Sequence, residues 1–236
     1  MQQPPLELHV ISAREVRELL PFDACVAAVR QAMQGVSAGN VLMPLRQFMP
    51  LPSGDGRLAW MPGYLGEPEC FGIKLLSLFP GNPRVGLSSH VGLYVLYESA
   101  HGRPVAIMEA SALTAIRTAA ASVVATLALA RPDAVPVAIL GTGKEASSHI
   151  DAFQAVRPFE RVIVWGRNPG ATRELAEYAL AAGCVHVEQI VWTPAPASPA
   201  SPASRFRLES VHGAPRAWDL APTDPTIDAL RDRCDH

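Results

Sequence analysis

The stretch Val137–Ala146, VAILGTGKEA, constrains this chain more than any other. Four apolar residues run directly into Gly141-Thr142-Gly143, and Ala146 completes the pattern G-x-G-x-x-A. A continuous apolar run is typical of a parallel strand that is covered on both faces. The first glycine allows a tight turn, the second lets the backbone approach a pyrophosphate, and the small third residue lets a helix pack closely. The stretch therefore predicts a strand, a phosphate-binding turn and a helix beginning near Lys144.

A second strand is predicted at Arg161–Trp165, after a gap long enough for a helix. It leads into Gly166-Arg167-Asn168, where an NAD-binding protein usually carries an acid for the ribose 2′-hydroxyl. Arg167 stands there instead, and an arginine suits a 2′-phosphate. We therefore expect NADP rather than NAD, the alternative being that Arg167 is an ordinary solvated side chain.

Composition narrows the class of protein further. The 236 residues suit one large or two modest domains. The net charge is −2 and there is no block of basic residues, so the sequence lacks the positive charge typical of a nucleic-acid-binding surface. The most apolar run, Thr118–Ala130, is bounded by Arg117 and Arg131 and is too short to cross a bilayer. The four cysteines lack metal-ligand spacing and are typical of reduced thiols, so we expect a cytoplasmic protein without a metal site.

The first half of the chain alternates between helix and strand patterns. Ser12-Ala13-Arg14-Glu15 is a capping box, and a second helix is expected over about 22–35. Strands are expected at 57–64, 70–79, 90–97 and 104–108, before an alanine-rich helix over 111–130. We predict an α/β protein with a strand-rich α+β domain at 1–132, a truncated Rossmann domain at 133–190 and a disordered Pro/Ala/Ser tail at 191–236.

Several polar residues stand in apolar surroundings. Lys74 lies inside an apolar strand pattern and is costly to bury without an anion; alternatively it protects an edge strand. Arg117 is the only charge inside the alanine-rich helix, so it must meet an anion or extend to solvent. Ser89 and His90 mark a loop-to-strand junction, where side chains often face ligands, although a capping or core role is common for an isolated histidine. Arg46 alone indicates only surface charge.

Together these segments resemble the ornithine cyclodeaminase/mu-crystallin family, from about Ser12 to about Val187. The most specific is Leu113–Ser122, LTAIRTAAAS, ahead of the glycine turn. The other segments that carry the resemblance are Pro44-Leu45-Arg46, Trp60–Tyr64, Gly72-Ile73-Lys74, Phe79–Asn82 and Ser89-His90. The resemblance implies a substrate-binding and dimerisation domain joined to a Rossmann domain, in a protein that is a homodimer.

The resemblance also implies roles at the substrate. Arg46 and Lys74 match the basic pair that holds the substrate carboxylate, and both are the implied catalytic residues, with Lys74 near the reacting imine carbon. Arg117 matches an arginine that contacts substrate or cofactor. The implied substrate is a small amino or imino acid, and the nicotinamide exchanges hydride with the carbon between nitrogen and carboxylate.

At the cofactor, Ser89 and His90 match a stretch that touches the nicotinamide half. Gly141, Thr142 and Gly143 match the pyrophosphate turn, and Arg167 and Asn168 match the 2′-phosphate edge. The implied cofactor is NADP, with NAD as the alternative.

Two departures from the family pattern stand out. Ornithine cyclodeaminases carry a glutamate where this chain has Ala59, which weakens the case for a diamine substrate. After about Val187 the resemblance ends, and a run of Pro, Ala and Ser follows that cannot bury enough surface to order a chain. This ending suggests a frameshifted or truncated reading, or a variant with a linker. We expect two strands of the dinucleotide sheet, a weakened affinity for NADP and no placeable acidic catalytic residue.

Three functions remain open from the sequence. The first is an NAD(P)-dependent reductase of cyclic ketimines or a related amino-acid dehydrogenase. The second is ornithine cyclodeamination, which releases proline and ammonia without net change in the cofactor. The third is a non-catalytic, ligand-binding remnant that dimerises through its strand-rich half.

Overall fold

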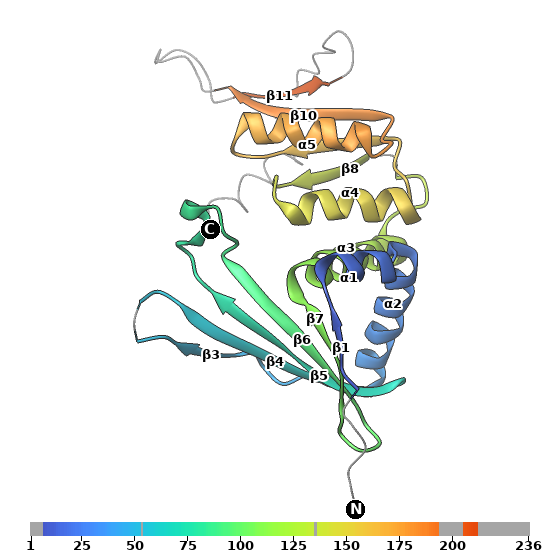
Figure 1. Ribbon diagram of the computed structural model, residues 1–236. Helices are drawn as coiled ribbons and strands as arrows, with labels where there is room; N and C mark the ends of the chain where they lie inside the picture. Colours follow the sequence, from blue (N-terminus) through green and yellow to red (C-terminus); the bar gives the residue numbers. More distant parts are fainter. Residues whose placement is uncertain (1–6, 53, 135, 194–204, 212–236) are drawn as a thin grey trace, which may run out of the picture. The chain divides into compact units, whose positions relative to one another are not determined.

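The computed structural model describes residues 7–52, 54–134, 136–193 and 205–211 (Figure 1). The chain divides into two compact units, Met1–Leu129 and Ala130–His236. The first unit combines a mostly antiparallel sheet with helices, and the second contains a small, mostly parallel sheet with helices. The expected fold class, a strand-rich α+β part followed by a Rossmann-type part, is thereby confirmed.

The described part of the first unit contains one sheet, whose strands are β1 (His9–Ile11), β2 (Val41–Leu42), β3 (Gln47–Pro50), β4 (Arg57–Gly66), β5 (Glu69–Leu78), β6 (His90–Glu98) and β7 (Pro104–Glu109). Their order is β1-β7-β6-β5-β4-β2, and β3 also pairs with β4. Only β1 and β7 pair in parallel. The four strands predicted from apolar patterns are the long central ones, β4 to β7.

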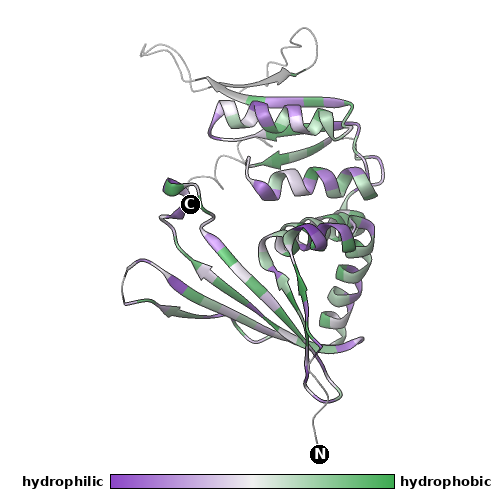
Figure 2. Ribbon diagram, in the orientation of Figure 1, coloured by the Kyte–Doolittle hydropathy of each residue, from purple (hydrophilic) through white to green (hydrophobic). Residues whose placement is uncertain are grey.

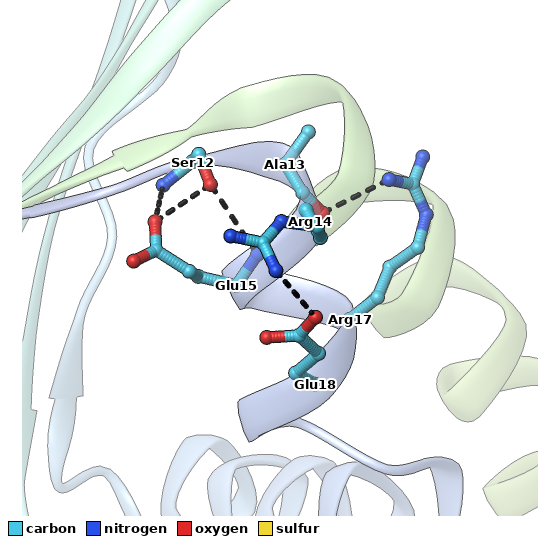
Figure 3. A network of polar contacts seen from close by, with 6 residues as sticks. All are labelled: Ser12, Ala13, Arg14, Glu15, Arg17 and Glu18. Atoms are coloured by element: carbon cyan, nitrogen blue, oxygen red, sulfur yellow. Dashed lines mark hydrogen bonds and ion pairs between the residues drawn. The ribbon is translucent and has the colours of Figure 1, made fainter.

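The helices of the first unit are α1 (Ala13–Leu19), α2 (Phe22–Ala38), the short 3₁₀ helix η1 (Asn82–Val85) and α3 (Ala110–Leu129). The capping box of α1 is confirmed (Figure 3): the Ser12 backbone N–H donates to Glu15 Oε2 at 2.9 Å, and the Glu15 N–H donates to Ser12 Oγ at 3.4 Å. The second helix runs past its expected end. It closes at Gly39, whose left-handed φ of +78° suits glycine, so Gly35 stays inside the helix.

Helix α3 is twenty residues long, longer than the apolar run that the sequence singled out. By length and composition alone it is long and apolar enough to cross a membrane, so the length argument against a span no longer applies. In the structure α3 packs against α1, α2 and the sheet. Its buried positions are mostly small, and Ala110, Ala119 and Ala120 are fully covered. These alanines let neighbouring backbones approach closely.

The sheet of the first unit has two different faces, since side chains alternate along each strand. Lys74 on β5 contacts Thr114 on α3, which identifies the face that carries the helices. The opposite face is almost entirely apolar along β4, β5 and β6. We call it the outer face; it consists of Leu58, Trp60, Ile73, Leu75, Val91, Leu93 and Val95. The ribbon in Figure 2 is coloured by residue for both faces together, so green apolar positions alternate there with paler and purple ones.

The second unit is built as strand–helix–strand–helix–strand. Its described elements are β8 (Pro136–Leu140), α4 (Lys144–Val156), β9 (Arg161–Trp165), α5 (Pro169–Ala181), β10 (His186–Thr193) and β11 (Arg205–Ser210). The sheet order is β11-β10-β9-β8, with β8, β9 and β10 parallel and β11 antiparallel. Its core is formed by apolar residues of both layers, among them Ile139, Ile150, Val162, Val164, Leu175 and Val187.

The sheet of the second unit is larger than expected. Instead of two strands, the described part has three parallel strands, and β11 adds a fourth. Both β10 and β11 reach into the stretch predicted as a disordered tail, which is therefore wrong for residues 191–193 and 205–210. The sequence RFRLES alternates polar and apolar residues, which is the pattern of a strand. This strand was not predicted because the neighbouring Pro/Ala/Ser run led us to expect disorder. The rest of the predicted tail lies outside the described residues.

Candidate active site

Lys74 is the one charged side chain among the described residues that is nearly fully buried, with 8% of its surface exposed. Its Nζ donates a hydrogen bond to Thr114 Oγ1 at 2.7 Å and lies 5.2 Å from the centre of the Tyr94 ring. No acidic side chain in the described ranges forms an ion pair with it. The edge-strand interpretation is wrong, because β5 lies between β4 and β6. A buried ammonium without a counter-ion is costly, so this position suits an anionic ligand.

The strand residues around Lys74 are uncharged. Lys74 pairs with Met61 on β4 and with Tyr94 on β6, and Tyr94 pairs in turn with Met108 on β7. These four residues form one row across the helix-bearing face. Ala59, in the neighbouring row, is fully buried and lies opposite Leu76. In these two rows of the helix-bearing face, Lys74 is therefore the one charged residue, and no acidic residue stands beside it.

Arg46 lies at the end of the same row. It directly precedes Gln47, which pairs with Trp60, and the next residue of β4, Met61, pairs with Lys74. Its side chain is exposed and has no hydrogen bond or ion pair to any described residue. The backbone thus places Arg46 near the row of Lys74 and leaves its guanidinium available.

Arg117 lies one helical turn beyond Thr114 on α3, and residues three apart are neighbours on a helix surface. Lys74, through its contact with Thr114, and Arg117 therefore lie at the same part of α3. Arg117 is exposed, in line with the second alternative given above, in which its long side chain extends to solvent. On α2, burial raises the pKa of the Cys25 thiol, and the positive charge of Arg117 opposes that shift.

Ser89 and His90 lie where the loop after η1 enters β6. Ser89 Oγ lies 2.8 Å from His90 Nδ1, and the Ser88 hydroxyl both accepts from the His90 N–H and donates to its carbonyl. His90 is exposed, so it is not a core histidine. The loop fixes the ring through one nitrogen and leaves Nε2 without a hydrogen bond to the described residues.

In the second unit, Gly141-Thr142-Gly143 forms the turn from β8 into α4, where the sequence pattern placed it. Gly141 has a φ of +124°, and its N–H donates to the Trp165 carbonyl at 2.7 Å. A Cβ built at Gly141 or Gly143 would meet no heavy atom within 4 Å. The turn therefore has room beside the free N–H groups at the start of α4, as a pyrophosphate requires.

The end of β9 has a different geometry. A Cβ at Gly166 would lie 2.4 Å from the methyl carbon of Thr142, so the Thr142 side chain packs directly over this glycine. Arg167 is exposed, whereas Asn168 caps α5 by accepting the Ala171 N–H at 3.2 Å. Of the two residues predicted at the 2′-phosphate edge, Arg167 has the freer side chain.

Three residues of these sites were not predicted from the sequence. Thr114 and Tyr94 surround Lys74, and Gly166 accommodates Thr142. Thr114 lies inside the segment that carries the family resemblance, but its contact with Lys74 spans forty residues of sequence. To predict that Tyr94 lies beside Lys74, one would have needed the pairing register of β5 with β6. No cluster of three His, Cys, Asp or Glu residues that could hold a metal occurs within the described ranges.

Known proteins with a similar sequence or fold fit this arrangement. A Delta(1)-pyrroline-2-carboxylate reductase of Bacillus cereus is 34% identical over 169 residues, which cover 72% of this chain and 52% of that protein. The structure of Thermococcus litoralis Delta(1)-pyrroline-2-carboxylate reductase in complex with NADH and L-proline matches with a TM-score of 0.70 and 31% identity, over 77% of this chain and 56% of that one. An archaeal alanine dehydrogenase dimer with bound NAD matches with a TM-score of 0.71 and 27% identity, over 78% and 56%.

The chain thus spans about half the length of the curated relatives it matches. The family model for ornithine cyclodeaminase/mu-crystallin proteins matches residues 7–192, which include both the Lys74 row and the glycine turn. The chain belongs to the ornithine cyclodeaminase/mu-crystallin family.

Proposed function

We propose that this protein is an NADP(H)-dependent reductase of small cyclic imino acids of the Delta(1)-pyrroline-2-carboxylate type. The observation that carries the proposal is the Lys74 ammonium, which is buried among uncharged side chains and has no acidic partner in the described part of the chain. Such a group can neutralise a single carboxylate on an otherwise uncharged molecule. Two relatives, described above, act on this class of substrate or bind L-proline.

The residues of the chain have separate tasks in this reaction. Lys74 holds the substrate carboxylate, and the exposed Arg46 and Arg117 provide further positive charge on the same unit. The uncharged row around Lys74 excludes a second ammonium, because no acid is available there to pair with it. This disfavours ornithine, which carries two. A reduced nicotinamide, when bound, would supply the hydride for the imine carbon, and water would supply the proton for the imine nitrogen.

The glycine turn suits the pyrophosphate of a dinucleotide, through the open space at Gly141 and Gly143 and the N–H groups of α4. We propose NADP rather than NAD because Arg167 stands exposed after β9 and can pair with a 2′-phosphate. The two structures described above contain NADH or NAD, so NAD is the alternative for this chain.

We also propose a homodimer formed through the outer face of the first unit. Val91 and Leu93 are 53% and 45% exposed, and the outer face carries no charge among its defining residues. Contiguous apolar surface of this kind marks a protein interface. The archaeal relative is a dimer.

The proposal is tested by incubating the purified chain with Delta(1)-pyrroline-2-carboxylate and either NADPH or NADH, and following oxidation of the cofactor. We expect turnover, with a lower KM for NADPH. Lys74→Met should lower kcat/KM by about 10- to 100-fold, because a hydrogen bond to a charged group is lost. Arg30→Met, which removes an exposed charge from α2, is the matched control. Absence of turnover by the folded protein would contradict the proposal and favour a ligand-binding role.

A further inference from the structure

The surroundings of the Lys74 ammonium are asymmetric. A lysine ammonium carries three N–H donors and no acceptor. Within the described part of the chain, one of these donors is used, by Thr114 Oγ1 at 2.7 Å. The Tyr94 ring lies under the same nitrogen at 5.2 Å and stabilises the positive charge without using a donor. Two N–H bonds are thus left for a ligand.

Thr114 also lies near Tyr94, at the long end of hydrogen-bond distance. Its hydroxyl oxygen lies 3.5 Å from the Tyr94 hydroxyl, so Lys74, Thr114 and Tyr94 form a closed triangle of contacts. Tyr94 belongs to β6, the neighbour of β5, and Thr114 belongs to α3. Two other elements, β6 and α3, therefore fix the end of a side chain that otherwise has four rotatable bonds.

We propose that Thr114 and Tyr94 are positioning residues, which hold the Lys74 ammonium so that its two remaining N–H bonds face one carboxylate of the substrate. This inference rests on the proposed function for the identity of the substrate, but the triangle itself makes a prediction about carboxylate binding alone. The hydroxyl of Thr114 sets the direction of the ammonium, and the ring of Tyr94 supports its charge. Loss of either residue should weaken carboxylate binding, although the Lys74 side chain itself is still present.

The chain offers an unusually clean readout, because it contains two lysines, Lys74 and Lys144. Amine acetylation followed by peptide mass spectrometry reports on each separately, without cofactor and without turnover. In the wild type we expect L-proline to slow the labelling of Lys74 and to leave Lys144 unaffected. Prolinamide, which lacks the carboxylate, should protect neither lysine.

Variants of the triangle then test the positioning role. Thr114→Val, of similar shape without an acceptor, should raise the L-proline concentration for half-protection by about tenfold, as expected for one lost hydrogen bond. Thr114→Ser should restore the wild-type value. Tyr94→Phe, which keeps the ring, should bind nearly normally, whereas Tyr94→Leu should resemble Thr114→Val and provides an independent test if that variant does not fold.

The same variants separate this inference from the proposed function. In the reductase assay Thr114→Val should raise KM for the imino acid more than it lowers kcat, with an unchanged thermal midpoint. If L-proline does not protect Lys74, or if Thr114→Val and Tyr94→Leu match the wild type, the positioning role is wrong. If protection behaves as expected but no imine is reduced, the inference stands and the proposed function fails.

Discussion

A pair of polar side chains on the second unit shows how burial and hydrogen bonding act on single residues. The Tyr178 hydroxyl on α5 lies 2.8 Å from both carboxylate oxygens of Asp151 on α4. Burial, followed by the bond to Asp151, raises the pKa of Tyr178 from 10.0 to about 12. Burial also raises the pKa of Asp151, although the Tyr178 hydrogen bond opposes that shift.

The shift of Tyr178 predicts how stability depends on alkaline pH. Because its pKa is higher in the folded state than in the unfolded chain, the stabilising contribution is complete below about pH 10 and is lost as the pH rises through about 12. Tyr178→Phe should cost about 1 kcal/mol of unfolding free energy near neutrality, a value reduced for the partial exposure of the pair. The difference from wild type should shrink as the pH rises through that window.

Urea unfolding of both proteins across this alkaline range measures the effect. Tyr97→Phe, whose ring stacks on Phe71, is a control because its hydroxyl has no carboxylate partner in the described ranges. An equal penalty for Tyr178→Phe at every pH would contradict the prediction.

Single residues were also where the sequence was least informative about the site. Lys74 could be singled out, because a lone cation in an apolar run is unusual, but edge protection and anion binding could not be separated. That decision required the position of β5 in the sheet. Thr114 and Tyr94 are ordinary residues in sequence. The packing of α3 on the sheet makes Thr114 a partner of Lys74, and the register of β5 with β6 does the same for Tyr94.

Among the elements, α1 was the best predicted, because its signal is local. Glu15 Oε2 accepts hydrogen bonds from both the backbone N–H and the hydroxyl of Ser12, and the hydroxyl bond is 2.6 Å long (Figure 3). These bonds lower the pKa of Glu15, with the side chain of Ser12 as the largest cause.

Removing this cap should be measurable in a helix of only seven residues. Ser12→Ala should cost about 1 kcal/mol of unfolding free energy at neutral pH. Because the pKa of Glu15 is lowered in the folded state, the contribution of its carboxylate is present at neutral pH and is lost as the pH falls through the folded pKa. The penalty of the substitution should therefore be smaller in acid.

Chemical denaturation at neutral and acidic pH tests this. Ser37→Ala is a suitable control, since Ser37 bonds back to Met33 within α2 and caps nothing. A penalty for Ser12→Ala that is the same in acid would show that Glu15 does not contribute.

Less local elements were predicted less well. The end of α2 depends on the left-handed Gly39, four residues beyond the end expected from the sequence. Strand β11 depends on pairing with β10 across a stretch of unrelated composition. For β11 the deciding interaction lies outside the segment itself.

On the scale of the whole molecule, the outer face of the first unit is the feature with the clearest consequence. Leu93→Glu places a second carboxylate on this face, between Leu75 on β5 and Glu109 on β7. Burying an unpaired carboxylate at an interface is strongly unfavourable, so this variant should be monomeric, whereas the wild type should form the proposed dimer. Light scattering during size-exclusion chromatography distinguishes the two.

Val185→Glu, at an exposed apolar residue of the second unit, is the matched control and should leave the mass unchanged. If Leu93→Glu has the mass of the wild-type dimer, the chains associate through another surface. At this scale the sequence predicted the fold class well, because the glycine turn and the family segments are distinctive. It underestimated the second sheet, since β10 and β11 had no comparable motif.

The fully covered alanines of α3 have a practical consequence for protein engineering. Ala110, Ala119 and Ala120 have no exposed surface, and larger residues inserted into a packed interior are destabilising. Libraries that aim to broaden substrate range should therefore keep these three codons fixed and diversify the strand positions around Lys74. The helix that carries Thr114 and Arg117 would then keep its backbone while the side chains around Lys74 change.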